Sequence, residues 1–107
     1  MRCAGQTCVA PQRAFVHRSV YQEFLELCTK IASDAQCGTL DEQANTGPLI
    51  DEASVVRMES LVADAVEKGA KIVCGGARPA DKKVGCYFLP TILTDVTPDM
   101  RVFREEV

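Results

Sequence analysis

The residues best suited to chemistry lie near the start of the chain, where a cysteine ends a run of small and polar residues. The run is Ala4-Gly5-Gln6-Thr7-Cys8. Gly5 can adopt backbone angles that other residues resist and lets the chain approach a ligand closely. This order predicts a turn, with a short helix in the range 5–10, that presents the Cys8 thiol. A thiolate presented in this way is a nucleophile for a bound carbonyl group.

The other cysteines do not form a metal-binding pattern. The chain has six cysteines, none of them in a C-x-x-C pair, and His17 is its single histidine. This composition predicts no zinc site, and His17 is expected to lie at the end of a strand. Cys28 lies on the apolar face of a predicted helix and Cys74 lies in an apolar run, so both are expected to fill the core.

Composition favours one small domain without an electrostatic partner. The chain has 107 residues, 47% of them hydrophobic and 25% charged, with a formal net charge of -3. Its twelve Lys and Arg residues are dispersed, which argues against nucleic acid and anionic membranes as partners. No apolar run reaches the ~18 residues of a membrane span, and residues 1–6 lack a signal-peptide core. We therefore expect a cytoplasmic chain with reduced cysteines.

Two amphipathic helices are expected to position the cysteine turn. Apolar residues recur at helical spacing in the range 20–33, where Ser19 and Gln22 form a capping-box pattern. A second helix should begin after Asp51, which can cap it, and end at Gly69. The polar range 34–50 between them predicts an irregular connection.

Strands are predicted at 13–17, at 70–74 and at 87–96, on alternating or β-branched residues. Pro90 favours an edge or irregular strand for the last of these. Thr97 and Pro98 predict the start of a short final helix that runs into 104–106. The order β-α-loop-α-β-β-α predicts a mixed α/β layer structure.

Segments along the full length of the chain resemble the aldehyde dehydrogenase superfamily. The segments that carry the resemblance are Gly5-Gln6-Thr7-Cys8 followed by Arg13, Thr46-Gly47-Pro48-Leu49-Ile50, Lys68-Gly69-Ala70 with Gly75-Gly76, Phe88-Leu89-Pro90-Thr91-Ile92-Leu93 and Arg104-Glu105-Glu106-Val107. Within the superfamily, the amino-acid sequence of 43–51 is most similar to that of the succinate-semialdehyde dehydrogenases. The resemblance implies that residues 1–107 are part of an α/β catalytic domain, with a mixed sheet and packed helices.

The resemblance also implies a role for three residues. Cys8 would be the nucleophile that forms a thiohemiacetal with an aldehyde, and its backbone N–H would be one oxyanion donor. Arg2, six residues earlier, would help to hold the distal carboxylate of the substrate. Glu106 would hydrogen-bond the nicotinamide ribose of NAD or NADP, with a solvated carboxylate as the alternative reading of this residue.

Other parts of the family's machinery have no match in this sequence. The 107 residues contain neither the family's E-L-G-G glutamate base nor its oxyanion asparagine, and no G-x-G-x-x-G dinucleotide signature occurs. Met1 and Cys3 stand where the family has an aromatic residue and usually an asparagine. Ala10 stands where some semialdehyde dehydrogenases have a redox-active second cysteine. We therefore expect no dinucleotide-binding domain here, no binding of NAD or NADP by this chain alone, and no complete catalytic cycle.

A non-catalytic reading stays open beside the enzymatic one. The same α/β segment could serve as a self-associating module in which Cys8 is an ordinary thiol. Under either reading, exposed sheet edges and apolar faces predict a homodimer or an exchange of strands, with 87–96 at or near the contact.

Overall fold

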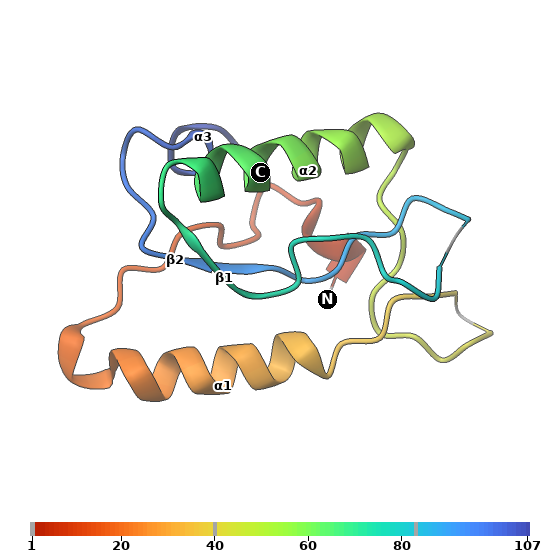
Figure 1. Cartoon of the computed structure of the whole chain (residues 1–107). Coiled ribbons are helices and arrows are strands. Elements are labelled where there is room, and N and C mark those ends of the chain that lie inside the picture. The colour runs from red at the N-terminus through yellow and green to blue at the C-terminus, as the bar shows by residue number, and fades with distance from the viewer. Residues whose placement is uncertain (1, 40, 83) are drawn as a thin grey trace.

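Two long helices lie on opposite sides of a short pair of strands (Figure 1). The computed structural model describes residues 2–39, 41–82 and 84–107, without the side chain of Arg2. The elements in order are the 3₁₀ helices η1 (Arg2–Gly5) and η2 (Arg18–Val20), helices α1 (Tyr21–Ser33) and α2 (Glu52–Glu67), strands β1 (Lys71–Cys74) and β2 (Ile92–Thr94), and helix α3 (Arg101–Arg104). Helices and strands in layers confirm the predicted α/β class.

Helix α2 begins and ends where the sequence predicted. The Asp51 carboxylate accepts a hydrogen bond from the Ser54 N–H at 2.7 Å, which caps the first turn. At the other end Gly69 adopts a left-handed φ of 102° and donates to the Val66 carbonyl at 3.0 Å. Ala70 donates to the Ala65 carbonyl at 2.9 Å, which completes a Schellman motif.

The core lies between α2, β2 and α3. Ala65, Ala70 and Met100 are buried together, and Leu93, Val96 and Val102 pack against them. Val55 and Leu61 are buried along the same apolar stripe of α2. Burial of this stripe supplies the hydrophobic free energy that holds α2 against the strands.

The two strands pair in antiparallel orientation, which brings the segment 71–74 beside the segment 92–94. Lys71 pairs with Thr94 and Ile72 with Leu93, and a bulge separates Ile72 from Cys74. The predicted strand at 70–74 is confirmed. The predicted strand at 87–96 shortens to β2, because Pro90 has no N–H to donate to a ladder.

A pair of glycines lets the chain after β1 approach the segment before β2. A Cβ built on Gly75 would lie 2.2 Å from the Pro90 carbonyl oxygen, and the Gly75 φ is +71°. The Gly76 N–H donates to the Thr91 hydroxyl at 2.8 Å. These contacts explain why a Gly-Gly pair and a Pro-Thr pair occur together in this chain.

Helix α1 forms as predicted, but its cap differs from the prediction. Ser19 lies inside η2, where its N–H donates to His17 Nδ1 at 3.3 Å and its hydroxyl pairs with the same nitrogen at 2.8 Å. Val20 is the N-cap residue of α1 and makes no side-chain capping bond. The capping-box prediction was wrong because the 3₁₀ turn moves Ser19 away from the capping position. His17 caps this turn instead.

Two further predictions were wrong, the strand at 13–17 and the helix start at Thr97. The range 13–17 has no regular secondary structure, since no described strand lies beside it to complete a ladder, and Phe15 is 86% exposed. Thr97 does not cap the last helix. Met100 donates to the Thr97 carbonyl at 3.1 Å, which closes a turn, and α3 begins after Met100.

The outer face of α1 is apolar and exposed. Leu27 is 57% and Ile31 is 73% exposed, and no residue of α1 is buried. Within the described ranges, no helix combines the length and the hydrophobicity needed to cross a bilayer.

Candidate functional site

The cysteine lies in a tight turn at the end of a strained segment. Cys3 and Ala4 have left-handed φ angles of 48° and 54°, and Gly5 follows at 86°. Such angles cost roughly 1–2 kcal/mol for a residue with a Cβ, whereas Gly5 adopts them freely. The predicted turn is confirmed. The short helix of this region is η1, which precedes the range 5–10 in which it was expected.

Cys8 occupies the second position of a turn that runs from Thr7 to Ala10. The Ala10 N–H donates to the Thr7 carbonyl at 2.9 Å, and the Cys8 side chain is exposed. Among the described residues, no acceptor for the Cys8 N–H is observed. A thiol beside its own unpaired N–H is an arrangement that can place a donor on an oxygen developing charge at the attacked carbon.

The Gln6 side chain ties this turn to the segment before α2. Gln6 Nε2 donates to the Cys3 carbonyl at 2.9 Å and more weakly to the Pro48 carbonyl at 3.5 Å. Gln6 Oε1 accepts from the Ile50 N–H at 2.9 Å. The structure thus joins two of the segments singled out in the sequence.

Gln12 and Arg13, which follow the cysteine turn, contact residues near the C-terminus. Gln12 Nε2 donates to the Val107 carbonyl at 2.9 Å. The Arg13 guanidinium donates to the Phe103 carbonyl and lies 5.7 Å from the centroid of the Phe103 ring. The Phe103 ring also packs edge-to-face on Phe15, with 6.5 Å between ring centroids.

Arg57 of α2 fixes the backbone of the predicted cofactor residue. Its guanidinium donates to the Glu106 carbonyl at 2.6 Å and forms an ion pair with the Glu105 carboxylate at 3.4 Å. The Glu106 side chain stays exposed. Its carboxylate is therefore free to accept hydrogen bonds from a ligand.

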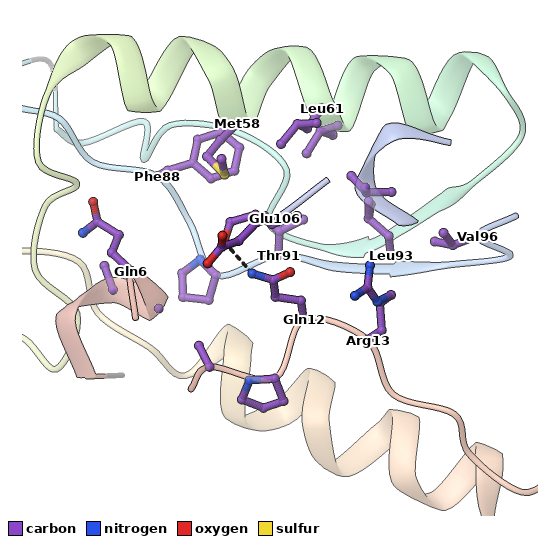
Figure 2. A pocket seen from close by; sticks show the side chains of 18 of the residues that line it. Gln6, Gln12, Arg13, Met58, Leu61, Phe88, Thr91, Leu93, Val96 and Glu106 are labelled. Atoms are coloured by element: carbon purple, nitrogen blue, oxygen red, sulfur yellow. Dashed lines mark hydrogen bonds between the residues drawn. The ribbon is translucent and has the colours of Figure 1, made fainter. Parts of the chain in front are cut away.

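Cys8 and Glu106, from opposite ends of the chain, line the same groove. The groove has a volume of about 1080 Å³ and is walled by the cysteine turn, α2 and the segment before β2. Figure 2 shows Glu106 beside Gln12, with Met58 and Phe88 on the opposite wall. A second hollow of about 530 Å³ is also lined by Cys8 and Glu106.

An exposed carboxylate in a groove suits the hydroxyls of a ribose, and an apolar wall suits a nicotinamide ring. The residues present therefore fit the nicotinamide end of NAD or NADP. The Gly-rich turn that would hold the cofactor's phosphates has no counterpart in the sequence. The side chain of Arg2, predicted to hold a substrate carboxylate, lies outside the described part of the chain.

The thiol of Cys37 is partly buried, unlike that of Cys8. Partial burial, together with the Asp81 carboxylate, raises the pKa of Cys37, and Lys82 opposes this only in part. Cys37 Sγ lies 3.7 Å from the Phe88 carbonyl oxygen. Cys28 and Cys74 are half-buried rather than fully buried.

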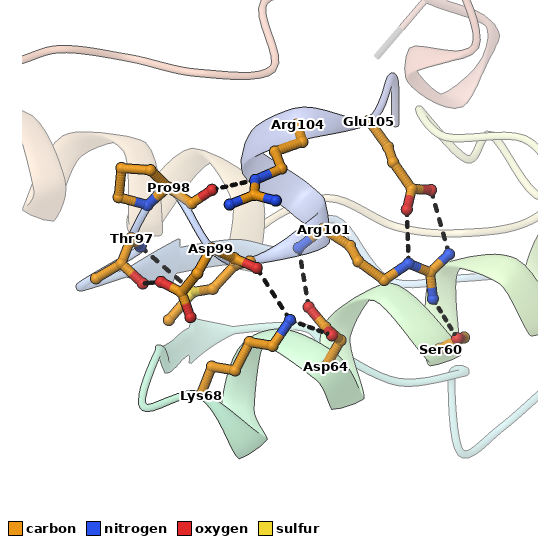
Figure 3. Close-up of polar contacts among 10 residues, drawn as sticks. Ser60, Asp64, Lys68, Thr97, Pro98, Asp99, Arg101, Arg104 and Glu105 are labelled. Carbon is orange, nitrogen blue, oxygen red and sulfur yellow. Dashed lines mark hydrogen bonds and ion pairs between the residues drawn. The ribbon is translucent and has the colours of Figure 1, made fainter.

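Hydrogen bonds between α2 and α3, with ion pairs at the end of each helix, hold the C-terminal segment (Figure 3). Asp64 accepts from the Arg101 N–H at 2.9 Å and pairs with Lys68 at 2.7 Å. These two contacts, the backbone hydrogen bond first, lower the pKa of Asp64. Arg101 in turn pairs with Glu105 at 2.6 Å and lowers the pKa of that carboxyl. The network fixes the residue next to Glu106.

The sequence did not reveal the supporting residues of this site. Gln6 lay within the cysteine run without an assigned role. Gln12 and Arg57 carried no signal, because their partners Val107 and Glu106 are far away along the chain. Only knowledge of which distant segments lie side by side in the fold could have indicated the roles of Gln12 and Arg57.

The whole chain matches a known family and its solved structures. Residues 1–107 match the model described as "Aldehyde dehydrogenase family". The succinate-semialdehyde dehydrogenase [NADP(+)] of Escherichia coli (strain K12) is 45% identical over 98% of this chain and 22% of its own length. A 3-sulfolactaldehyde dehydrogenase of Pseudomonas putida is 43% identical over 98% of this chain and 21% of its own length.

Solved structures agree with these sequence matches. A succinate-semialdehyde dehydrogenase from Burkholderia pseudomallei superposes with a TM-score of 0.84 and 45% identity, over 92% of this chain and 20% of its own. A betaine aldehyde dehydrogenase from Staphylococcus aureus, in complex with NAD+, superposes with a TM-score of 0.90 and 32% identity. The match covers 96% of this chain and 21% of that protein's chain. The chain thus spans about a fifth of the length of these relatives. It belongs to the aldehyde dehydrogenase family.

Proposed function

We propose that this chain is the nucleophile-bearing part of an NAD(P)-dependent aldehyde dehydrogenase, with Cys8 as the nucleophile. The observation that carries the proposal is the shared groove, because it brings the Cys8 thiol and the Glu106 carboxylate to one cavity. A reacting carbon at the thiol and a cofactor ribose at the carboxylate would then share one groove, in which the nicotinamide ring carried by that ribose would reach the carbon.

The first step follows from the chemistry of the thiol. The Cys8 thiolate attacks the aldehyde carbon, a C–S bond forms, and the electron pair of the carbonyl bond moves to oxygen. The Cys8 N–H, which has no acceptor among the described residues, donates to this oxygen. Glu106 is the residue that would hold the ribose hydroxyls of a nicotinamide cofactor, which would supply the acceptor for a hydride from the same carbon.

The substrate class follows from the relatives. Two of them are named for succinate semialdehyde and 3-sulfolactaldehyde, which are both short aldehydes with an anionic group. We propose an aldehyde of this class, with succinate semialdehyde as the first choice, and Arg2 as the residue that binds its carboxylate.

These 107 residues do not contain the whole machinery. A glutamate base, an oxyanion asparagine and a dinucleotide-binding signature have no match among them. We therefore expect the chain on its own to bind an aldehyde covalently but not to reduce NAD or NADP.

The test measures adduct formation at Cys8. The purified chain is mixed with succinate semialdehyde carrying ¹³C at the aldehyde carbon, and the thiohemiacetal carbon is followed by NMR. We expect an adduct that disappears in Cys8→Ala and persists in Cys3→Ala, which removes the exposed thiol nearest along the chain. Absorbance of NADH or NADPH is followed in parallel, and no turnover is expected.

Each outcome decides a separate claim. Equal adduct formation in wild type and Cys8→Ala would reject Cys8 as nucleophile and favour the self-associating module. Turnover that Cys8→Ala abolishes would keep Cys8 as nucleophile and reject the expectation that the chain needs further parts.

A further inference from the structure

Gln6 uses both ends of its amide to connect the cysteine turn with the rest of the fold. Its oxygen accepts from the Ile50 N–H at 2.9 Å, and its nitrogen donates to the Cys3 carbonyl at 2.9 Å. The nitrogen also reaches the Pro48 carbonyl at 3.5 Å. One side chain therefore joins the strained start of the turn to the segment 48–50.

The segment that Gln6 contacts is itself firmly held. The Leu49 N–H donates to the Cys86 carbonyl at 2.7 Å. Asp51, the next residue after Ile50, caps α2. Gln6 is thus bonded to a fixed part of the molecule rather than to a loose loop.

The turn has little else to fix it. Among the described residues, its backbone hydrogen bonds stay within the turn, from Gln6 to Cys3, from Thr7 to Gly5 and from Ala10 to Thr7. Beyond it, the next side-chain bonds to the body of the protein come from Gln12 and Arg13. The orientation of the Cys8 N–H and thiol relative to the groove therefore depends on Gln6.

We propose that Gln6 is a positioning residue for the reaction of Cys8: its amide holds the turn so that the Cys8 N–H and thiol face the same carbonyl group. The inference rests on the proposed function. Gln6 itself takes no part in bond making. Its contribution should appear in steps that need the N–H and the thiol together, and not in simple alkylation of the thiol.

The experiment compares Gln6→Met with Gln22→Met. Methionine has nearly the shape of glutamine but cannot make these hydrogen bonds. Gln22 is a matched control, since among the described residues its side-chain amide bonds only to Glu26, also in α1, at 2.8 Å. Three quantities are measured: the dissociation constant of the Cys8 adduct with ¹³C-labelled succinate semialdehyde, the rate of alkylation of Cys8 by iodoacetamide, and amide hydrogen exchange at Ile50.

In Gln6→Met we expect the adduct dissociation constant to rise about fivefold, in line with the loss of one or two hydrogen bonds. The alkylation rate should change less than about twofold, because this reaction needs no oxyanion donor. Exchange at Ile50 should become faster. Gln22→Met should match wild type in all three measurements.

Gln6→Glu keeps an acceptor for the Ile50 N–H but loses the donor, so its Ile50 exchange should lie between wild type and Gln6→Met. It also serves if Gln6→Met does not fold. An adduct as tight in both Gln6 variants as in wild type, or unchanged exchange at Ile50, would overturn the inference. A wild-type chain with no adduct at Cys8, but with the expected exchange difference, would instead count against the proposed function.

Discussion

At the scale of single residues, the six cysteines differ in what their surroundings allow. Cys8 is exposed at the second position of a turn, with its N–H unpaired among the described contacts. Cys37 is half-buried, and its pKa is raised. A raised pKa leaves less thiolate at neutral pH, and thiolate is the reactive form.

We therefore predict that iodoacetamide at pH 7 labels Cys8 several times faster than Cys37. The difference should narrow as the pH rises, since more of the Cys37 thiol is then ionised. Peptide mass spectrometry, with fragment ions that separate Cys8 from Cys3, measures both rates. Labelling of Cys37 as fast as Cys8 throughout the pH range would contradict the environments described.

At the scale of elements, the fold depends on a few local features at the ends of helices and strands. Asp51 and Gly69 fix the two ends of α2, and Gly75 brings the chain after β1 against Pro90. The first two fix where α2 begins and ends, and α2 forms one wall of the groove.

Gly75→Ala should destabilise the protein by roughly 2–3 kcal/mol, because the new Cβ would lie 2.2 Å from the Pro90 carbonyl oxygen in a left-handed backbone. Gly47→Ala is the control, since among the described residues no heavy atom beyond its two chain neighbours lies within 4 Å of its Cβ position. It should stay within about 0.5 kcal/mol of wild type. Urea unfolding followed by circular dichroism compares the two. Equal midpoints would show that the contact at Gly75 is readily relieved.

Asp51→Ala should lower the melting temperature by a few degrees, because Ser54 loses the acceptor of its N–H and its hydroxyl. Asp51→Asn keeps an oxygen acceptor and should restore most of the loss. Thermal unfolding by circular dichroism measures both. A melting temperature in Asp51→Ala that equals the wild type would reject the capping role.

At the scale of the whole molecule, the fold is held together by ion pairs as well as by a small core. The pKa is lowered in the carboxyl groups of Glu42, Asp51, Glu59, Asp64, Asp99 and Glu105. Each folded-state pKa therefore lies below the unfolded value of about 4. Their contribution to stability is complete above that value and is lost as the pH falls through the folded pKa values.

We predict that the urea midpoint is steady from pH 7 to about pH 5 and falls steeply below about pH 4. Asp64→Asn tests one contribution, since its partners are the Arg101 N–H and Lys68. The variant should be less stable than wild type at pH 7, and the two should converge at low pH. A constant difference at every pH would show that the charge of Asp64 is not the cause.

The described part of the molecule exposes apolar side chains and the edges of a small sheet. The apolar face of α1 and the free edges of the two described strands leave hydrophobic groups and backbone donors in solvent. We predict that the chain dimerises at micromolar concentration, with 87–96 at or near the contact. Sedimentation velocity of wild type and Ile92→Lys is the measurement. A wild-type monomer would contradict dimerisation, and a dimer unaffected by Ile92→Lys would contradict its location.

The sequence by itself determined the features that depend on neighbouring residues: α2 with its Asp51 cap and Gly69 end, the strand at 71–74, and the cysteine turn. Local hydrogen bonds and backbone angles decide these, and residue types within a few positions reveal them. The sequence also indicated the family, because its segments keep their order and spacing. The tertiary structure alone decided which distant segments meet. Gln6 with Ile50, Gln12 with Val107 and Arg57 with Glu106 are pairs of groups that come together only when the core folds. The range 13–17 failed as a strand for the same reason, since a strand requires a partner that its own sequence does not supply.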